Sequence, residues 1–356
     1  MIKEAIKTAV EGNNLTFETA GGAMDEIMRG EATAAQIAAF LTALRMKGES
    51  IDEITACAAV MRAHCTRLPC NLEVIDVVGT GGDGAHTFNI STVTAFVAAA
   101  GGVPVAKHGN RSVSSKCGAA DFLEALGANI GLTAEQSAQV LQKTNMCFMF
   151  APNHHASMKY AAPIRKEIGA RTIFNILGPL SNPAAATIQL MGVYDEKLVL
   201  PLARVLSNLG VHRALVVHGD DGLDEISLTT TTTACEVLDG ELRQYQLDPQ
   251  ELGFSYCQPG DLTGGGAEEN VRIAQAIFNG EKGPHRDIVL LNSAACLCLA
   301  GKAQSLSNGV EQASMLIDRS LALQKMQDFV QATQEASLAA QEASLAAQEA
   351  SYEVTV

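Results

Sequence analysis

Tryptophan is absent from this 356-residue sequence, and aromatic residues make up only 4% of it. The hydrophobic core must therefore be built mainly from alanine, valine, leucine and isoleucine. The sequence also has no run of about 18 apolar residues, so we expect no transmembrane helix and no membrane partner. Its N-terminus, MIKEAIKTAVEGNNLT, lacks the apolar stretch of a signal peptide.

Cysteine pairs are missing as well. The nine cysteines are scattered and odd in number, and no Cys-x-x-Cys motif occurs. Neither a disulfide framework nor a zinc site is therefore suggested. A reducing compartment is the simpler explanation of such cysteines, and without a signal peptide we expect the protein to be cytoplasmic.

An excess of basic residues is also lacking, because the formal net charge is −14. Nucleic-acid-binding proteins usually present a basic surface to phosphates, so this balance argues against a nucleic-acid partner. It does not exclude a small anionic substrate, which a few basic side chains, backbone N–H groups and a metal ion can hold locally.

Apolar residues are abundant. They make up 47% of the sequence and charged residues 18%, which is typical of a packed protein. Residues 1–66 have apolar positions at helical spacing and predict a block of helices. Short apolar runs then alternate with helical segments, which indicates an α/β sheet with a parallel part. The predicted strands are 74–78, 103–107, 146–150 and 214–218, with a fainter candidate at 289–291.

The C-terminal residues differ in composition from the rest. Residues 334–347 contain QEASLAA twice, and QEAS follows, so only one apolar residue recurs per heptad. That is too little for a coiled-coil seam, although Ala, Glu, Gln and Leu favour helix. We therefore expect residues 331–356 to form a low-complexity helical tail with no part in the chemistry.

Polar loops follow the predicted strands, where the ligands of α/β sheets gather. GTGGD (79–83) can bring backbone N–H groups against an anion, although an ordinary strand-to-helix turn is the alternative. Polar side chains continue to the start of the next helix, whose N-terminus favours phosphate. They are Thr87, Asn89, Ser91 and Thr92.

Charged residues in three further loops suggest specific ligands. KHGNRSVSSK (107–116) suits phosphate oxygens, with a solvated basic loop as the alternative. After the third strand, Arg165 can hold a carboxylate through two bonds, whereas nothing near His154 and His155 completes a metal site. After the fourth strand, the carboxylates of Asp224 and Glu225 suit oxygen-ligated Mg²⁺, and Asp83 could contribute to the same metal site. A solvated acidic turn is the alternative.

Six motifs follow one another along the sequence: GTGGD (79–83), NIST (89–92), KHGNRSVSSKCGAAD (107–121), the segment from two histidines to an arginine (154–165), FNILGPLSNP (174–183) and LDE (223–225). In this order and spacing they resemble those of the anthranilate phosphoribosyltransferase family. Each is modestly specific alone, but six in order over ~150 residues indicate the family. The resemblance covers roughly residues 1–330.

The resemblance implies a small helical domain and a larger α/β domain with a central, mostly parallel sheet, the architecture of nucleoside phosphorylases and phosphoribosyltransferases. The helical domain would comprise residues 1–70 with an insert near 165–185, and the α/β domain residues 71–330. It implies a Mg²⁺-dependent enzyme of tryptophan biosynthesis that joins phosphoribosyl pyrophosphate (PRPP) to anthranilate. A homodimer formed through the helical domain and an association with anthranilate synthase are further expectations.

The resemblance also implies roles for individual residues. Catalysis would depend on Lys107, Asn110 and Arg165. The expected anthranilate contacts are Gly79, His108, Asn110, His155 and Arg165, and the expected Mg²⁺ ligands are Ser91, Asp224 and Glu225. The expected PRPP contacts are Gly79, Gly82, Asp83, Thr87, Asn89, Ile90, Ser91, Thr92, Lys107, His108, Gly109, Asn110, Arg111, Ser112, Val113, Ser114, Ser115 and Ala119. Cys117 and Ala119 stand where the family often has serine, which would weaken or remove two phosphate donors.

Two rival assignments differ from this one in testable features. A pyrimidine nucleoside phosphorylase shares the architecture, but it would bind inorganic phosphate and would not need the acidic pair at 224–225. A nucleic-acid-binding relative would need a basic face, and the net charge of −14 and the intact KHGNR segment speak against it. The fold-level part of the prediction is analogy, whereas the site-level part rests on the named residues.

Overall fold

The computed structural model describes residues 1–112 and 116–353, with side chains described as far as residue 339. The chain opens with helices, and side-chain caps set the start points of three of them. Thr16 accepts the N–H of Thr19, and Thr33 and Ser50 each form a capping box with the residue three positions on. The helices of residues 1–64 are α1 (Ile2–Val10), α2 (Phe17–Met28), α3 (Ala34–Lys47) and α4 (Ile51–His64).

Within the described residues, seven strands form one sheet in the order β3-β2-β1-β4-β5-β6-β7. The strands from β3 to β5 in that order are parallel, and β6 and β7 continue the sheet antiparallel. The predicted α/β class with a mostly parallel sheet is confirmed. The strands are β1 (Ile75–Gly79), β2 (Val105–Gly109), β3 (Met146–Phe150), β4 (Ile188–Gly192), β5 (Arg213–Gly219), β6 (Thr232–Leu238) and β7 (Glu241–Leu247).

The fainter strand candidate at residues 289–291 is wrong. These residues lie inside helix α13 (Pro284–Leu299), in which Ile288, Val289, Leu290 and Leu291 are all buried. Four consecutive buried residues cover the whole circumference of a helix, so the apolar run has no amphipathic period. A short run of this kind does not distinguish a buried strand from a buried helix.

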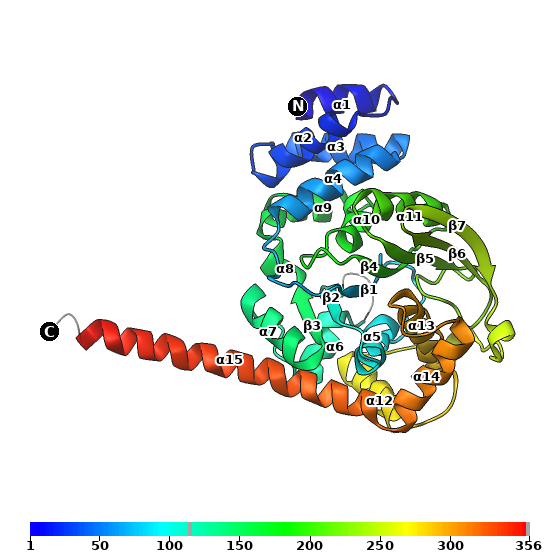
Figure 1. The fold of residues 1–356 in the computed structure, drawn as a ribbon. Helices are drawn as coiled ribbons and strands as arrows, with labels where there is room; N and C mark the ends of the chain where they lie inside the picture. Colours follow the sequence, from blue (N-terminus) through cyan, green and yellow to red (C-terminus); the bar gives the residue numbers. More distant parts are fainter. Residues whose placement is uncertain (113–115, 354–356) are drawn as a thin grey trace.

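Different helices cover the two faces of the sheet (Figure 1). Along β4, Leu190 belongs to one hydrophobic core and its neighbour Met191 to the other, as expected for a strand with two buried faces. Helices α5, α13 and α15 contribute to the first core, and α1–α4, α10 and α11 to the second. The remaining helices are α5 (Ile90–Ala100), α6 (Ala119–Ala125), α7 (Ala134–Thr144), α8 (Ala151–His154), α9 (Ala162–Ile168), α10 (Phe174–Leu180), α11 (Val199–Asn208), α12 (Ala267–Phe278), α14 (Leu306–Asp318) and α15 (Leu321–Glu353).

Segments distant in sequence join the N-terminal helices. Helix α9 packs against α3, and α10 packs against α4. Arg62 of α4 fixes the second contact, because its Nε donates to the carbonyl of Leu180 at 2.7 Å. Helices α9 and α10, which follow β3 in the sequence, therefore belong to the helical layer above the sheet (Figure 1).

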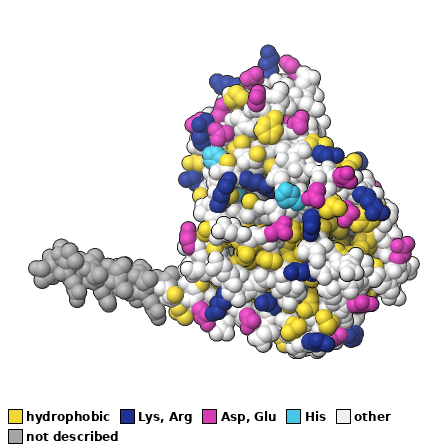
Figure 2. All heavy atoms as spheres, viewed as in Figure 1, with side chains coloured by type: hydrophobic (Ala, Val, Ile, Leu, Met, Phe, Trp, Pro, Cys, Tyr) yellow, Lys and Arg dark blue, Asp and Glu magenta, His cyan; other side chains and the backbone are white. Residues whose placement is uncertain are grey.

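Helix α15 begins on the α/β core and leads away from the body of the molecule (Figure 1). Phe329 and Ala332 are buried, and Thr333 Oγ1 accepts the N–H of Asn129 at 3.0 Å. No helix in the described part of the chain combines the length and apolar character needed to cross a membrane. On the face shown in Figure 2, Lys and Arg side chains are interspersed with Asp and Glu.

Candidate active site

Two glycines allow an acidic loop to lie directly on the ends of the parallel strands. Gly79 ends β1 and Gly192 ends β4, and the two are register partners. A Cβ atom on Gly192 would lie 1.5 Å from the carbonyl oxygen of Asp224, and one on Gly79 would lie 2.4 Å from its Oδ2. Only glycine leaves room for Asp224 at this point.

Asp224 is tied to the glycine-rich loop that follows β1. The N–H of Gly81 donates to Asp224 Oδ2 at 2.6 Å, and Asp83 lies beside the same carboxyl group. Gly81 and Gly82 have φ values of +69° and +75°, so the loop uses the left-handed backbone that glycine permits. The predicted GTGGD loop and the predicted acidic pair are thus brought together.

The acidic pair is buried and electrostatically unfavourable as it stands. Asp224 and Glu225 are each 9% exposed. Burial, and then the neighbouring Asp83, raise the pKa of Asp224 to about 7. Burial and the charge of Asp224 raise the pKa of Glu225 well above its ordinary value. A bound cation would relieve this repulsion, and carboxylate oxygens are the ligands that Mg²⁺ prefers.

Lys107 faces this pair from inside the sheet. Its side chain is 2% exposed, and Nζ donates to the carbonyl of Val77 at 2.5 Å and to Ser91 Oγ at 3.1 Å. Burial lowers the pKa of Lys107, and Asp76 and Glu225 oppose that shift. In this geometry Lys107 joins β1 and β2 to the first turn of α5, and its ammonium group does not extend into solvent.

The described residues contain no group of three or more His, Cys, Asp or Glu side chains arranged to hold a metal ion. The candidate set is instead the two carboxylates, with Ser91 close by, because the N–H of Ser91 donates to Glu225. Two protein carboxylates suit Mg²⁺, which usually completes its shell with waters and substrate phosphates. The donors present therefore fit Mg²⁺ and do not fit a closed zinc site.

The segment from Thr87 to Thr92 leads into helix α5. Thr87 pairs with Thr263, and Ile90 and Thr92 are buried in the helix. Asn89 precedes the helix, and its side chain is bonded to Cys117: Nδ2 donates to the carbonyl and Oδ1 accepts from Sγ, both at 3.2 Å. The Asn89 side chain, predicted to contact PRPP, therefore holds the loop after β2.

The predicted basic loop is only partly described, because Val113, Ser114 and Ser115 lie outside the described residues. Asn110 is exposed, Gly109 ends β2 and Ala119 opens α6. Arg111 does not point to the acidic pair. It forms ion pairs with Asp121 at 3.0 Å and Glu124 at 2.5 Å, both on α6.

The histidines form a buried pair. The ring centroids of His108 and His155 are 5.0 Å apart, and the Nε2 atoms of both have no hydrogen-bond partner within the described part of the chain. Burial, and then neighbouring His154, lower the pKa of His155 to about 4. Uncharged imidazole rings of this kind suit contact with an aromatic ligand. Arg165 lies on α9, with its guanidinium 5.2 Å from the ring centroid of Phe174.

Residues without a predicted role also contribute. Arg171 donates to the carbonyl of Gly82 and stacks over Tyr194 with 4.0 Å between its guanidinium and the ring centroid. Asp76 is buried on β1 beside Lys107, and it accepts the N–H of His108 at 3.2 Å. Asp121 accepts the N–H groups of Ser112 and Gly118, which lie near the two ends of the loop between β2 and α6. A carboxylate within KHGNRSVSSKCGAAD was a usable signal for Asp121, whereas the motifs give none for Arg171.

Comparison with known proteins agrees with this arrangement. Residues 3–65 match the helical bundle domain of a glycosyl transferase family, and residues 71–323 match the α/β domain of the same family. An anthranilate phosphoribosyltransferase from Ruminiclostridium cellulolyticum is 60% identical over 93% of this chain and 97% of its own length. One from Methanobrevibacter smithii is 56% identical over 94% and 99%.

Solved structures of the same enzyme are also similar. The Thermus thermophilus enzyme superposes with a TM-score of 0.88 at 41% identity, covering 93% of this chain and 99% of that one. The Saccharomyces cerevisiae enzyme in complex with PRPP and Mg superposes with a TM-score of 0.87 at 27% identity, covering 94% and 98%. The chain therefore belongs to the anthranilate phosphoribosyltransferase family of glycosyl transferases.

Proposed function

We propose that this enzyme transfers the 5-phosphoribosyl group of PRPP to the amine of anthranilate and releases pyrophosphate, a step of tryptophan biosynthesis. One observation carries the proposal: a buried acidic pair and a glycine-rich loop meet at the carboxyl edge of the parallel sheet in a chain with full-length relatives of that activity. Inorganic phosphate alone, the substrate of the phosphorylase alternative, gives no reason for a second buried carboxylate.

We propose that Asp224, Glu225 and Ser91 hold Mg²⁺ together with the pyrophosphate of PRPP. The raised pKa values of both carboxyl groups support this role, since a cation would offset their repulsion. The related yeast enzyme was solved with PRPP and Mg. When bound, the ion would offset the negative charge that develops on departing pyrophosphate.

The remaining PRPP contacts would come from backbone and side-chain groups around the strand ends. We propose that the loop containing Gly79, Gly82 and Asp83 surrounds the pyrophosphate, and that the first turn of α5 adds N–H groups and a favourable dipole. Lys107 would act from inside the sheet. Its Nζ donates to Ser91 Oγ, and its positive charge favours the ionised form of Glu225. We retain the other predicted PRPP contacts, from Thr87 to Ala119, as part of this proposal.

Anthranilate would be held by its carboxylate and its ring. We propose that Arg165 binds the carboxylate and that His108 and His155 flank the ring. Asn110 and Gly79 would lie next to the end of anthranilate that reacts. The aromatic amine is weakly basic and reaches the site uncharged, so no strong general base is needed. Catalysis would then consist of placing this nitrogen against C1 of the ribose while pyrophosphate leaves through an oxocarbenium-like state.

We also propose a cytoplasmic homodimer formed through the helical layer. Val10, Phe17 and Met46 on α1–α3 are 71%, 50% and 83% exposed, which is unusual for large apolar side chains. Light scattering on the purified protein tests the dimer, and co-purification with anthranilate synthase tests the further expected association. A monomer at micromolar concentration would contradict the dimer.

The activity is tested by following anthranilate fluorescence after mixing enzyme, PRPP and Mg²⁺. We expect loss of fluorescence that requires both PRPP and Mg²⁺. Folded protein without this activity would contradict the proposal. Phosphorolysis of a pyrimidine nucleoside, or a shift of nucleic acid in a gel, would then support one of the two alternatives.

A further inference from the structure

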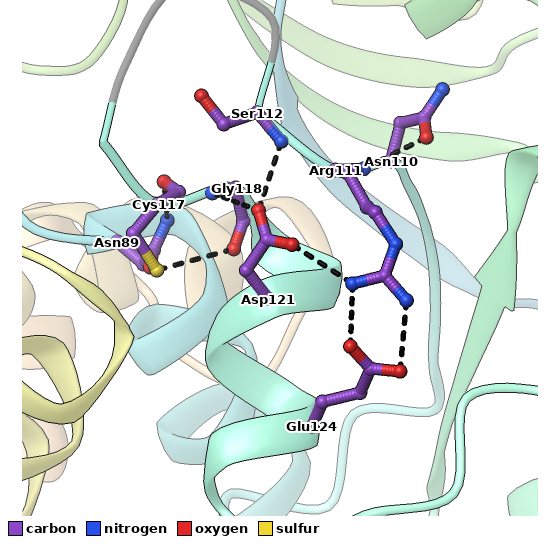
Figure 3. Close-up of polar contacts among 8 residues, drawn as sticks. All are labelled: Asn89, Asn110, Arg111, Ser112, Cys117, Gly118, Asp121 and Glu124. Atoms are coloured by element: carbon purple, nitrogen blue, oxygen red, sulfur yellow. Dashed lines mark hydrogen bonds and ion pairs between the residues drawn. The ribbon is translucent and has the colours of Figure 1, made fainter.

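The carboxylate of Asp121 lies between the two ends of the loop that joins β2 to α6 (Figure 3). Its Oδ2 accepts the N–H of Ser112 at 3.0 Å and the N–H of Gly118 at 2.9 Å. Its Oδ1 accepts from Arg111 Nη1 at 3.0 Å. Asp121 therefore accepts hydrogen bonds from Arg111 and Ser112 near the start of the loop and from Gly118 at its end.

The two ends of this loop are pressed together at Gly118. A Cβ atom there would lie 2.3 Å from the nitrogen of Ser112 and 2.6 Å from the carbonyl carbon of Arg111. The N–H of Ala120 also donates to the carbonyl of Asn110 at 3.2 Å. The approach of two backbone segments leaves N–H groups that need an acceptor, and the charged Oδ2 of Asp121 accepts two of them.

The charge balance around Asp121 supports this role. Burial opposes its ionisation, but the N–H groups of Ser112 and Gly118 and the guanidinium of Arg111 outweigh burial and lower the pKa of Asp121. Glu124 lies one turn further along α6 and pairs with Arg111 at the surface. Within the described residues Glu124 accepts no backbone N–H of the loop, so it offers a matched control.

The loop is connected to both sides of the proposed substrate site. At its start, Asn110 follows β2 and is a proposed anthranilate contact. At its end, Cys117 is joined to Asn89 by two reciprocal hydrogen bonds, and Asn89 stands directly before α5. A change in the separation of the loop ends would therefore move Asn110 relative to the first turn of α5.

We propose that Asp121 is a positioning residue for PRPP: it clamps the ends of the β2–α6 loop so that Asn110 and the start of α5 keep the spacing that PRPP requires. Arg111 braces this clamp through its hydrogen bond to Asp121 Oδ1. The inference rests on the proposed function for its substrate, and on the contacts of Asp121 for its geometry.

The first test is Asp121→Asn, which keeps the size of the side chain but replaces the charged oxygen that accepts both backbone N–H groups with a neutral one. It also removes the oxygen that accepts from Arg111. We expect the KM for PRPP to rise about tenfold, the size of effect that losing one charge-assisted hydrogen bond produces. The KM for anthranilate at saturating PRPP should rise less than the KM for PRPP, because Asn110 is the only proposed anthranilate contact on this loop. The melting temperature should change little. Glu124→Gln should leave the KM for PRPP within about twofold, because a surface ion pair contributes little.

A second variant separates the loop ends without changing Asp121. Gly118→Ala places its Cβ against the nitrogen of Ser112, and we expect the same selective rise in the KM for PRPP. The proposal is overturned if Asp121→Asn and Glu124→Gln behave alike, or if both KM values change equally. It is also overturned if Gly118→Ala leaves the KM for PRPP unchanged.

Amide hydrogen exchange at Ser112 and Gly118 tests the clamp without any turnover. We expect faster exchange at both amides in Asp121→Asn and unchanged exchange in Glu124→Gln. Unchanged exchange in Asp121→Asn overturns the clamp, even in an enzyme that proves active. Conversely, if the wild-type protein does not consume anthranilate, the proposed function is wrong. The exchange rates at Ser112 and Gly118 would still show whether Asp121 holds the loop ends together.

Discussion

Arg165 is a half-buried guanidinium without a carboxylate partner among the residues described. Burial lowers its pKa, and its one ring contact is with Phe174. A half-buried planar cation without a carboxylate partner is suited to binding a planar anion, and the carboxylate of anthranilate has that shape.

We expect Arg165→Ala to raise the KM for anthranilate roughly 10- to 100-fold, because a charge-assisted pair is worth about 1.5–3 kcal/mol. The KM for PRPP should change little. Steady-state kinetics with each substrate varied in turn measure both values. Lys166→Ala, an exposed neighbour on α9, is the control. A large fall in kcat at unchanged KM for anthranilate would argue against carboxylate binding.

Asp224 illustrates a conflict between function and stability at one residue. Its buried carboxylate has a raised pKa because of burial and of Asp83, so the ionised form costs free energy when no cation is present. The N–H of Gly81 needs only one acceptor oxygen, which an amide also provides.

We therefore expect Asp224→Asn to raise the melting temperature of the metal-free protein, by about 2 °C for each kcal/mol regained. The same change should raise the Mg²⁺ concentration for half-maximal activity by about tenfold, the loss expected for one charged ligand. Thermal unfolding in EDTA and a Mg²⁺ titration of activity measure the two effects. An unchanged Mg²⁺ titration would remove Asp224 from the metal site.

His155 connects pH to stability, because burial lowers its pKa from 6.5 to about 4 in the folded protein. The unfolded chain binds the proton more tightly, so the contribution of His155 is present above pH 6.5 and is lost as pH falls towards 4. The full effect is about 3 kcal/mol at most. The raised pKa values of Asp76 and Asp224 act in the opposite direction over part of this range.

Comparison with His155→Gln isolates that contribution. Between pH 7 and pH 4.5, we expect the free energy of unfolding of the wild type to fall more steeply than that of the variant. Urea titrations at both pH values provide the measurement. Equal pH dependence in the two proteins would show that His155 is not buried uncharged.

At the scale of elements, β1, β2, β3 and β5 were predicted from the sequence, whereas β4, β6 and β7 were not. β3 is MCFMF and its bounds follow directly from the sequence. β7, ELRQYQL, is mostly polar because it forms the exposed edge of the sheet, so no apolar run marks it. β4, IQLMG, contains a glutamine whose Nε2 is buried against the carbonyl of Pro179, a partner that the local sequence does not reveal.

Some parts of the site could likewise be predicted from the sequence, and others could not. The Asp224–Glu225 pair and the glycine-rich loop could be predicted because each combines distinctive chemistry with a position after a strand. Gly192 was missed, since its requirement for glycine arises from Asp224, which approaches it only in the folded chain. The inward position of Lys107 could not be predicted either, because a lysine in a basic loop is ordinarily solvated.

At the scale of the whole molecule, helix α15 combines a packed beginning with an extension. Ala332 is buried, Thr333 Oγ1 accepts from Asn129 N, and Gln136 donates to the carbonyl of Ala336 at 2.9 Å. The 331 residues aligned with the Ruminiclostridium cellulolyticum enzyme cover 97% of that relative. The packed beginning should therefore matter for stability, whereas the part of the repeat beyond residue 339 should not.

Two truncations separate these parts. A chain ending at Ala339 keeps every contact just named, and we expect its melting temperature and its kcat/KM for both substrates to equal those of the full chain. A chain ending at Gln331 loses them, and we expect its free energy of unfolding to fall by about 3 kcal/mol, since each lost hydrogen bond contributes ~1 kcal/mol and buried apolar surface is lost as well. Urea titration and the anthranilate assay on both chains measure the difference. A marked loss of activity on ending at Ala339 would give the repeat a role in the enzyme, because the acidic pair, the loops and the core of α15 are all retained in that chain.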